Sequence, residues 1–232
     1  MNKKFCIIGL GNFGISLALY LNDEGAEVMV IEKDLKKVEY AAERVALAVQ
    51  MDSTEEKSLI SLGIKDMDAV IVAIGEDFEA SLNTVAILQE LGVQKIYARV
   101  ISPIHERLLK LMNITDLLYP EAEAARHLVN RLLIPGLLES FEISKDFGIF
   151  EINTPKYLVG KTLLEANLRK EYNLNLVTVK QLKFKKKNTI FSENTEKYDV
   201  VGVIKPDYVF IETDVLVLFG KESDFKDLLK IV

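Results

Sequence analysis

Three glycines near the amino terminus have the spacing of a phosphate-binding turn. Gly9, Gly11 and Gly14 follow an apolar run and open a helical pattern, with Asn12 and Phe13 between them. In such a turn the first glycine permits a sharp bend, the second lets a phosphate approach the backbone, and the third lets the helix pack closely on a sheet. Backbone amides at the start of the helix then hold phosphate oxygens. The loop therefore predicts a site for the phosphates of a nucleotide.

An acidic residue stands where this kind of site places its ribose ligand. Glu32 ends the second predicted strand, about twenty residues beyond the glycine loop, and Lys33 follows it. A carboxylate there accepts hydrogen bonds from the ribose hydroxyls and repels a 2′-phosphate. We therefore expect NAD(H) or an adenine nucleotide such as ATP or ADP rather than NADP. A glycine turn without a ligand is the alternative.

Further candidates follow other strands of the predicted sheet. Because ligands of parallel sheets bind at the carboxyl ends of the strands, we expect these residues at the same site: Asp52, Ser53, Thr54, Ala73, Ile74, Gly75, Glu76 and Arg99. The first three could equally cap a helix, and Ser53 with Glu56 has the spacing of a capping box. Small residues from 73 to 75 would form a wall against a base. Arg99 could bind a phosphate or pair with a carboxylate.

The elements that must position these residues alternate along the first half of the chain. Short apolar runs predict strands, and segments with helical spacing predict helices between them. The strands are expected at 5–8, 28–31, 46–49, 69–73, 95–100 and 117–119, and the helices at 12–24, 34–42, 54–62, 77–91 and 104–112. This order is typical of an α/β fold with a doubly wound parallel sheet, a Rossmann domain.

The second half differs. An amphipathic helical pattern begins at Pro120, ends before Pro135-Gly136, and has no obvious seventh strand after it. Period-two alternation then predicts a small α+β subdomain with strand-like segments near 150–152, 174–179, 201–203 and 215–219, a helix at 163–170 and a final helix from 223 to about 232. A lysine-rich run from 183 to 187 is expected at a hairpin tip. We expect a Rossmann domain with a crossover helix over 1–140 and a C-terminal subdomain over 141–232.

Composition argues against several classes of protein. The 232 residues carry 29 lysines and arginines against 35 aspartates and glutamates, a net charge of −6, which disfavours nucleic acid as a partner. The single cysteine, Cys6, excludes an intrachain disulfide framework and is expected to be an inert core thiol. No apolar run is long enough to predict a membrane-spanning helix.

Catalytic equipment is not recognisable. Hydride transfer needs a proton donor or acceptor beside the substrate carbonyl. The two histidines, His105 and His127, both fall in predicted helices without a catalytic pattern, and we expect ordinary packing or surface roles for them. We therefore expect a nucleotide-binding protein that is not an enzyme. The alternative is a small NAD-dependent oxidoreductase.

These motifs resemble those of the RCK domain, the regulator-of-potassium-conductance module. In the first half the resemblance rests on the segments 8–14, 52–54, 70–74 and 119–121 together with Glu32, and in the second half on 158–163, 168–169, 176–177 and 214–220. Nearly the whole chain is covered. The chain is most similar to the regulatory subunits of Ktr/Trk potassium uptake systems, of the KtrA type.

The resemblance implies a cytoplasmic regulatory subunit held at the inner face of the membrane by its partner. Such proteins bind ATP, ADP or NAD(H) at the glycine loop and form homodimers that assemble into an octameric ring. The ring docks on a membrane potassium-translocating subunit and gates it through ligand-driven changes of its shape.

Three residue-level expectations also come from the resemblance. Glu121 is expected to help hold a cation, divalent or Na⁺, near the nucleotide phosphates. Arg169 and Asn175 are counterparts of residues that bind cyclic di-AMP in some relatives. Asn12 stands where KtrA-type proteins often carry arginine, so discrimination between ATP and ADP through a charge-assisted contact at that position is in doubt.

Overall fold

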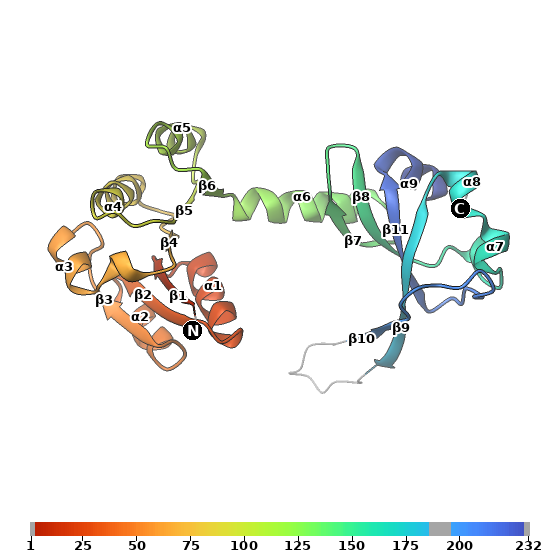
Figure 1. Ribbon diagram of the computed structural model, residues 1–232, viewed down its shortest axis with the longest axis horizontal. Helices are drawn as coiled ribbons and strands as arrows, with labels where there is room; N and C mark the ends of the chain where they lie inside the picture. Colours follow the sequence, from red (N-terminus) through yellow and green to blue (C-terminus); the bar gives the residue numbers. More distant parts are fainter. Residues whose placement is uncertain (1–2, 186–195, 230–232) are drawn as a thin grey trace. The chain divides into compact units, whose positions relative to one another are not determined.

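The computed structural model describes residues 3–185 and 196–229. The chain divides into two compact units, residues 1–122 and 123–232 (Figure 1). This division and the expected boundary after residue 140 differ in the placement of one helix, α6 (Pro120–Leu133), and of the strand that follows it. The domain boundary after residue 140 stays a prediction.

The first unit contains the predicted doubly wound parallel sheet. Its strands are β1 (Lys4–Ile8), β2 (Glu27–Glu32), β3 (Leu47–Gln50), β4 (Ala69–Val72), β5 (Ile96–Arg99) and β6 (Asp116–Leu118), in the order β3-β2-β1-β4-β5-β6. Its helices are α1 (Asn12–Asp23), α2 (Leu35–Ala42), α3 (Glu56–Ser61), α4 (Phe78–Glu90) and α5 (Pro103–Leu111), with a 3₁₀ turn, η1 (Ile64–Asp66). The strand order reverses between β1 and β4, so the carboxyl ends of these two strands flank the crevice where ligands of such sheets bind.

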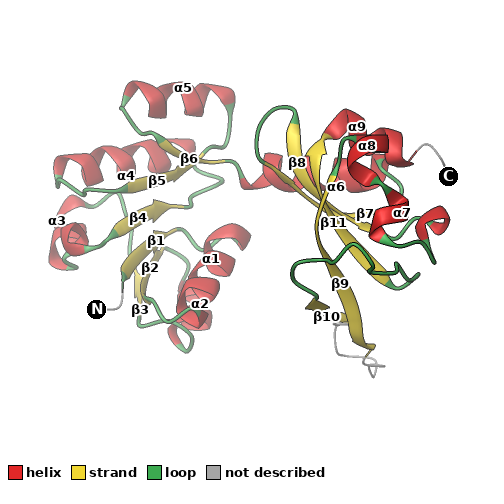
Figure 2. Ribbon diagram, turned by 45° about the vertical axis from the view of Figure 1, so that its right-hand side comes forward, coloured by secondary structure: helices red, strands yellow, loops and turns green. Residues whose placement is uncertain are grey.

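Both faces of this sheet are covered by helices, as Figure 2 shows. Alternate residues of β1 belong to different cores. Ile7 packs with Ala18 of α1, whereas Cys6 packs with Leu59 of α3 and Leu109 of α5. Burial on both faces explains why the strands are apolar at successive positions. The prediction that Cys6 is a buried core thiol is confirmed, and burial raises its pKa well above the ordinary value.

The second unit is an α+β domain built on an antiparallel sheet. Its strands are β7 (Leu137–Glu142), β8 (Phe147–Asn153), β9 (Asn175–Lys185), β10 (Glu196–Val200) and β11 (Asp214–Lys221), in the order β10-β9-β11-β8-β7. Its helical segments besides α6 are η2 (Lys156–Leu158), α7 (Leu163–Ala166), α8 (Leu168–Tyr172) and α9 (Glu222–Leu229). The aromatic rings of Phe150 and Phe225 stack in its core, with centroids 4.3 Å apart.

Three expectations for the second unit are wrong. A strand, β7, does follow α6, and its pairing with β8 stabilises it. The helix expected over 163–170 is two short helices, since Asn167 between them has a positive φ of 47°. Residues 201–203 are not a strand, because β10 ends at Val200. Of the lysine-rich run, residues 186 and 187 lie outside the described residues.

The expected capping box at the third helix is also wrong. Helix α3 begins only at Glu56, because Asp52 accepts a hydrogen bond from the amide of Thr54 at 2.9 Å and forms a local turn first. Ser53 is buried and its hydroxyl group bonds that of Thr84 at 2.8 Å. Within the ranges described, no helix combines the length and the apolar character needed to cross a membrane.

Gly14 is a packing requirement of the first unit. A Cβ atom built on Gly14 would stand 2.0 Å from the carbonyl oxygen of Gly9, a backbone atom that cannot move aside cheaply. We predict that Gly14→Ala lowers the free energy of unfolding by about 3 kcal/mol or more. Gly11→Ala is the control, with an expected loss of about 1 kcal/mol or less. Urea denaturation measures both, and equal losses would contradict the prediction.

His105 makes the first unit sensitive to acid. Its side chain is fully buried, and burial lowers its pKa. The unfolded state has the ordinary pKa of about 6.5, so below that pH the unfolded state binds more protons and stability falls. We predict that His105→Asn, which keeps a hydrogen-bond acceptor for the amide of Ile101, loses less unfolding free energy between about pH 7.5 and pH 5.5 than the wild type. His127→Asn is the control at the half-buried histidine of the second unit, which pairs with Glu139, and it should leave the pH dependence of the first unit unchanged.

Candidate functional site

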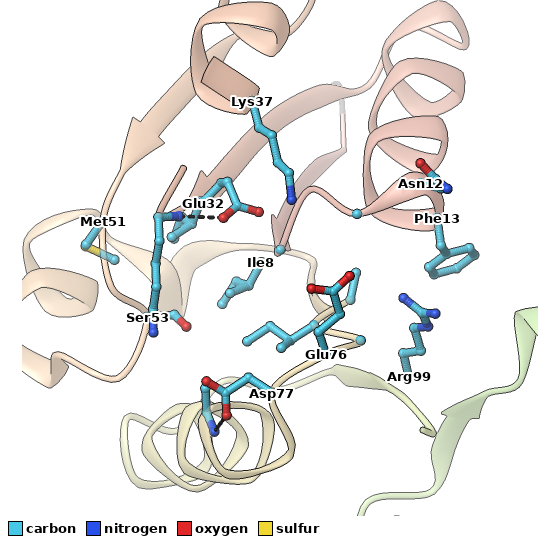
Figure 3. Close-up of a pocket in the computed structure, with 18 of the residues that line it drawn as sticks. Ile8, Asn12, Phe13, Glu32, Lys37, Met51, Ser53, Glu76, Asp77 and Arg99 are labelled. Atoms are coloured by element: carbon cyan, nitrogen blue, oxygen red, sulfur yellow. Dashed lines mark hydrogen bonds between the residues drawn. The ribbon is translucent and has the colours of Figure 1, made fainter. Parts of the chain in front are cut away.

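A cavity of about 420 Å³ opens at the carboxyl ends of β1 and β4, where the strand order reverses (Figure 3). It is large enough for a nucleotide-sized ligand. The residues that line it are Ile8, Gly9, Gly11, Asn12, Phe13, Ile31, Glu32, Lys33, Lys37, Met51, Ser53, Ala73, Ile74, Gly75, Glu76, Asp77, Ala80, Arg99 and Glu121. The glycine loop and the ends of four strands thus meet at one place.

The glycine loop has the geometry that each glycine predicts. Gly9 has a positive φ of 95°, and its amide donates a hydrogen bond to the carbonyl of Ile31 at 2.8 Å. Gly11 has an ordinary φ of −67° and immediately precedes α1, and no side chain caps that helix. A Cβ atom on Gly11 would have only one neighbour within 4 Å, a guanidinium nitrogen of Arg99 at 3.9 Å. The chain's own packing therefore does not require glycine at this position, whereas a phosphate on the loop would.

Glu32 ties the end of β2 to the glycine loop. One carboxylate oxygen, Oε2, accepts a hydrogen bond from the amide of Leu10 at 2.7 Å. The other, Oε1, accepts from the amides of Lys33 at 2.8 Å and Asp34 at 3.1 Å. An ionised carboxylate has about four lone-pair sites, so one remains on Oε2 for a ribose hydroxyl. The side chain both shapes the loop and lines the cavity.

Two lysines bring positive charge to the same end of the cavity. Lys33 pairs with Asp52 at 3.0 Å. The pKa of Asp52 is lowered, first by its hydrogen bond from the Thr54 hydroxyl and also by Lys33. Lys37, in the first turn of α2, makes no ion pair among the residues described, and its side chain extends toward the cavity in Figure 3. Lys37 is thus a free cation at the site.

Arg99 and Glu121 close the other end. The guanidinium Nη2 of Arg99 pairs with Oε1 of Glu121. Arg99 also lies directly against Gly75, where a Cβ atom would overlap its guanidinium. The expected pairing of Arg99 with a carboxylate is confirmed, and its binding of a phosphate stays a prediction. In Figure 3, Arg99 lies on one side of the cavity and Glu32 on the other.

Most of the residues expected from the sequence line this cavity, but three do not. Gly14 faces Gly9 rather than the cavity, and Asp52 and Thr54 bond each other beside it. Whether the lining residues bind a ligand stays a prediction. Sequence reasoning missed Ile8, Ile31, Lys37, Met51, Asp77 and Ala80. Most of these flank predicted strand ends, whereas Lys37 lies within the predicted helix over 34–42.

A cation site does not form from one chain's described residues. No group of three or more histidine, cysteine, aspartate or glutamate side chains gathers there in a way that could hold a metal ion. The carboxylate of Glu121 is instead paired with Arg99. In the second unit, Arg169 and Asn175 do lie together, with Asn173, around a separate hollow.

Comparisons with known proteins agree with this geometry. Residues 5–120 match the model of the TrkA-N domain family. The chain is 36% identical over 204 residues to the Ktr system potassium uptake protein C of Bacillus subtilis, covering 88% of this chain and 92% of that protein. It is 28% identical to the Ktr system potassium uptake protein A of the same organism over 225 residues, covering 97% and 95%.

Solved structures show the same fold. The GsuK RCK domain superposes with a TM-score of 0.62 at 18% sequence identity, covering all of this chain and 48% of the other chain. The GsuK channel bound to NAD superposes with a TM-score of 0.58, covering 97% of this chain and 38% of that one. This chain therefore spans less than half the length of either. From its glycine loop, its fold and these relatives, the chain belongs to the TrkA-N domain family and is a relative of the Ktr system potassium uptake proteins.

Proposed function

We propose that this protein is the nucleotide-binding regulatory subunit of a potassium uptake system and that it acts on a membrane potassium-translocating subunit. The observation that carries the proposal is the cavity at Gly11, where the packing of the chain leaves room for a Cβ atom and does not itself require glycine. Relatives named as Ktr system potassium uptake proteins match nearly full length, which supports the assignment to potassium uptake.

The ligand is an adenine nucleotide or NAD(H). The adenosine ribose lies at Glu32, which keeps one free acceptor site, and the phosphates follow the amides at the start of α1 toward Arg99. The GsuK channel, whose RCK domain has this fold, has been solved with NAD bound, which supports the class of ligand. The neutral Asn12 supplies no charge to the phosphates, so the positive charge must come from Lys37 and Arg99.

Regulation works by linkage rather than by chemistry on the nucleotide. A ligand that binds two conformations with different free energies shifts the population between them, typically by about 1–3 kcal/mol of coupling. In this proposal, homodimers assembled in a ring transmit that shift to the membrane subunit from the cytoplasmic side. The protein is then not an enzyme.

Two additional ligands implied by the resemblance depend on more than one chain. A cation at Glu121 needs further ligands, from phosphate oxygens or a second copy, because one chain pairs this carboxylate with Arg99. Cyclic di-AMP at the second unit needs Arg169 and Asn175, which lie around one hollow. Neither ligand is required for the binding of a nucleotide at the glycine loop.

Gly11→Ala tests nucleotide binding. The added methyl group fits the ligand-free fold but lies where a phosphate must approach the loop amides. Losing one such charge-assisted hydrogen bond weakens binding about tenfold or more. Isothermal titration calorimetry with ADP, ATP and NADH measures this effect, and a thermal melt of each sample verifies folding. Wild-type protein that binds none of the three would refute the proposal.

Potassium flux tests the regulatory role. Proteoliposomes carrying the Ktr-type membrane subunit of the same organism should show nucleotide-dependent potassium influx when this protein is added. Gly11→Ala should abolish the nucleotide dependence, because the bound ligand drives the shift between conformations. Influx that ignores both the protein and the nucleotide would contradict this role. Steady oxidation of NADH or reduction of NAD with added substrates would instead favour the oxidoreductase alternative.

A further inference from the structure

Arg99 is a mostly buried cation whose hydrogen-bonding capacity is largely unused. Its side chain is 16% exposed, and among the residues described only Nη2 has a hydrogen-bond partner, the carboxylate of Glu121. The Nε atom is buried and has no hydrogen-bond partner in the structure as described. A guanidinium has five N–H donors in a planar fork, and leaving buried donors unpaired is unfavourable. The unused donors indicate that the side chain can bind a second anion.

The position of Arg99 decides which anion this is. Its Nη1 atom would be 3.9 Å from a Cβ on Gly11, so it lies beside the start of α1 where phosphates are expected. Glu32, the ribose ligand of the proposed function, lies at the opposite side of the cavity in Figure 3. A nucleoside monophosphate held at Glu32 ends at the loop. A second phosphate extends the ligand toward Arg99.

Glu121 competes with that phosphate for Arg99. The two carboxylate oxygens share one negative charge, whereas a terminal phosphate carries nearly two and offers three oxygens. Phosphate therefore matches the arginine fork at least as well as carboxylate does. Glu121 is 64% exposed, so water solvates its carboxylate when Arg99 leaves it. Exchange of carboxylate for phosphate thus gives Arg99 a partner that matches it at least as well, and it costs Glu121 little free energy because water solvates the released carboxylate.

We propose that Glu121 is an autoinhibitory counter-ion for Arg99, and that the terminal phosphate of a nucleoside diphosphate or triphosphate displaces it. The inference rests on the proposed nucleotide site and adds the residue that selects ligands with a terminal second phosphate. Glu121 belongs to the first turn of α6, the helix that continues into the second unit. Displacement therefore releases the start of that helix from β5 only when such a ligand is bound.

Calorimetric titration of ADP and AMP, with EDTA present to remove divalent cations, tests the exchange. Glu121→Gln should bind ADP about threefold more tightly than the wild type, because the competing ion pair is gone, and should bind AMP with unchanged affinity. Arg99→Gln should bind ADP about tenfold more weakly, again with AMP unchanged. In the Arg99→Gln background, Glu121→Gln should change nothing, since the two residues act through each other.

Glu123→Gln is the matched control, since Glu123 is an exposed carboxylate of the same helix that does not line the cavity. It should leave the ratio of ADP to AMP affinity unchanged. Arg99→Lys provides a second variant that keeps the charge without the fork, with an ADP affinity expected between those of wild type and Arg99→Gln.

Three results would overturn the inference. These are an unchanged or weaker ADP affinity of Glu121→Gln, an equal gain for AMP, or a gain that persists without Arg99. Each leaves the proposed function intact as long as wild-type protein binds ADP. Wild-type protein that binds neither ADP nor AMP would refute the nucleotide site, and this inference with it.

Discussion

The close approach of α1 to the turn after β1 is the constraint on which the site depends. The backbone of Gly14 lies so near the carbonyl of Gly9 that no side chain fits between them. This contact aims the start of α1, and with it a set of backbone amides, at the carboxyl edge of the sheet. Glu32 then fixes the loop from the other side through the amide of Leu10. Helix, turn and strand end form one rigid frame before any ligand arrives.

In the part of the chain that the structure describes, two of the three cationic side chains that line the cavity are already paired with carboxylates. Lys33 is paired with Asp52 and Arg99 with Glu121, whereas Lys37 makes no ion pair among the residues described. Paired cations at a cavity limit the electrostatic cost of the empty site, because each is neutralised while water still reaches it. In the proposed function, a phosphate ligand competes with protein carboxylates rather than with bulk water alone. Such competition lets a binding site report on the charge of its ligand and not only on its shape.

Local patterns predicted the first unit well and the second less well, for a physical reason. A strand such as β4, buried on both faces, must be apolar throughout, so its signal is independent of its neighbours. In the antiparallel sheet, β7 mixes apolar and polar residues, is largely exposed, and is a strand because β8 pairs with it. Asn167 adopts a left-handed conformation that divides a helix which its neighbours alone would continue.

The parallel sheet, the glycine loop and the acidic residue at the end of β2 were predictable from the amino-acid sequence, because each depends on residues close together in the chain. The pairing of Arg99 with Glu121, the place of Lys37 in the cavity lining and that of Asp52 beside it emerged only from the folded chain. These outcomes depend on how a strand end, a helix turn and a loop approach one another in space. Spacing along the chain specifies which element carries a side chain, whereas packing of the elements specifies what that side chain meets.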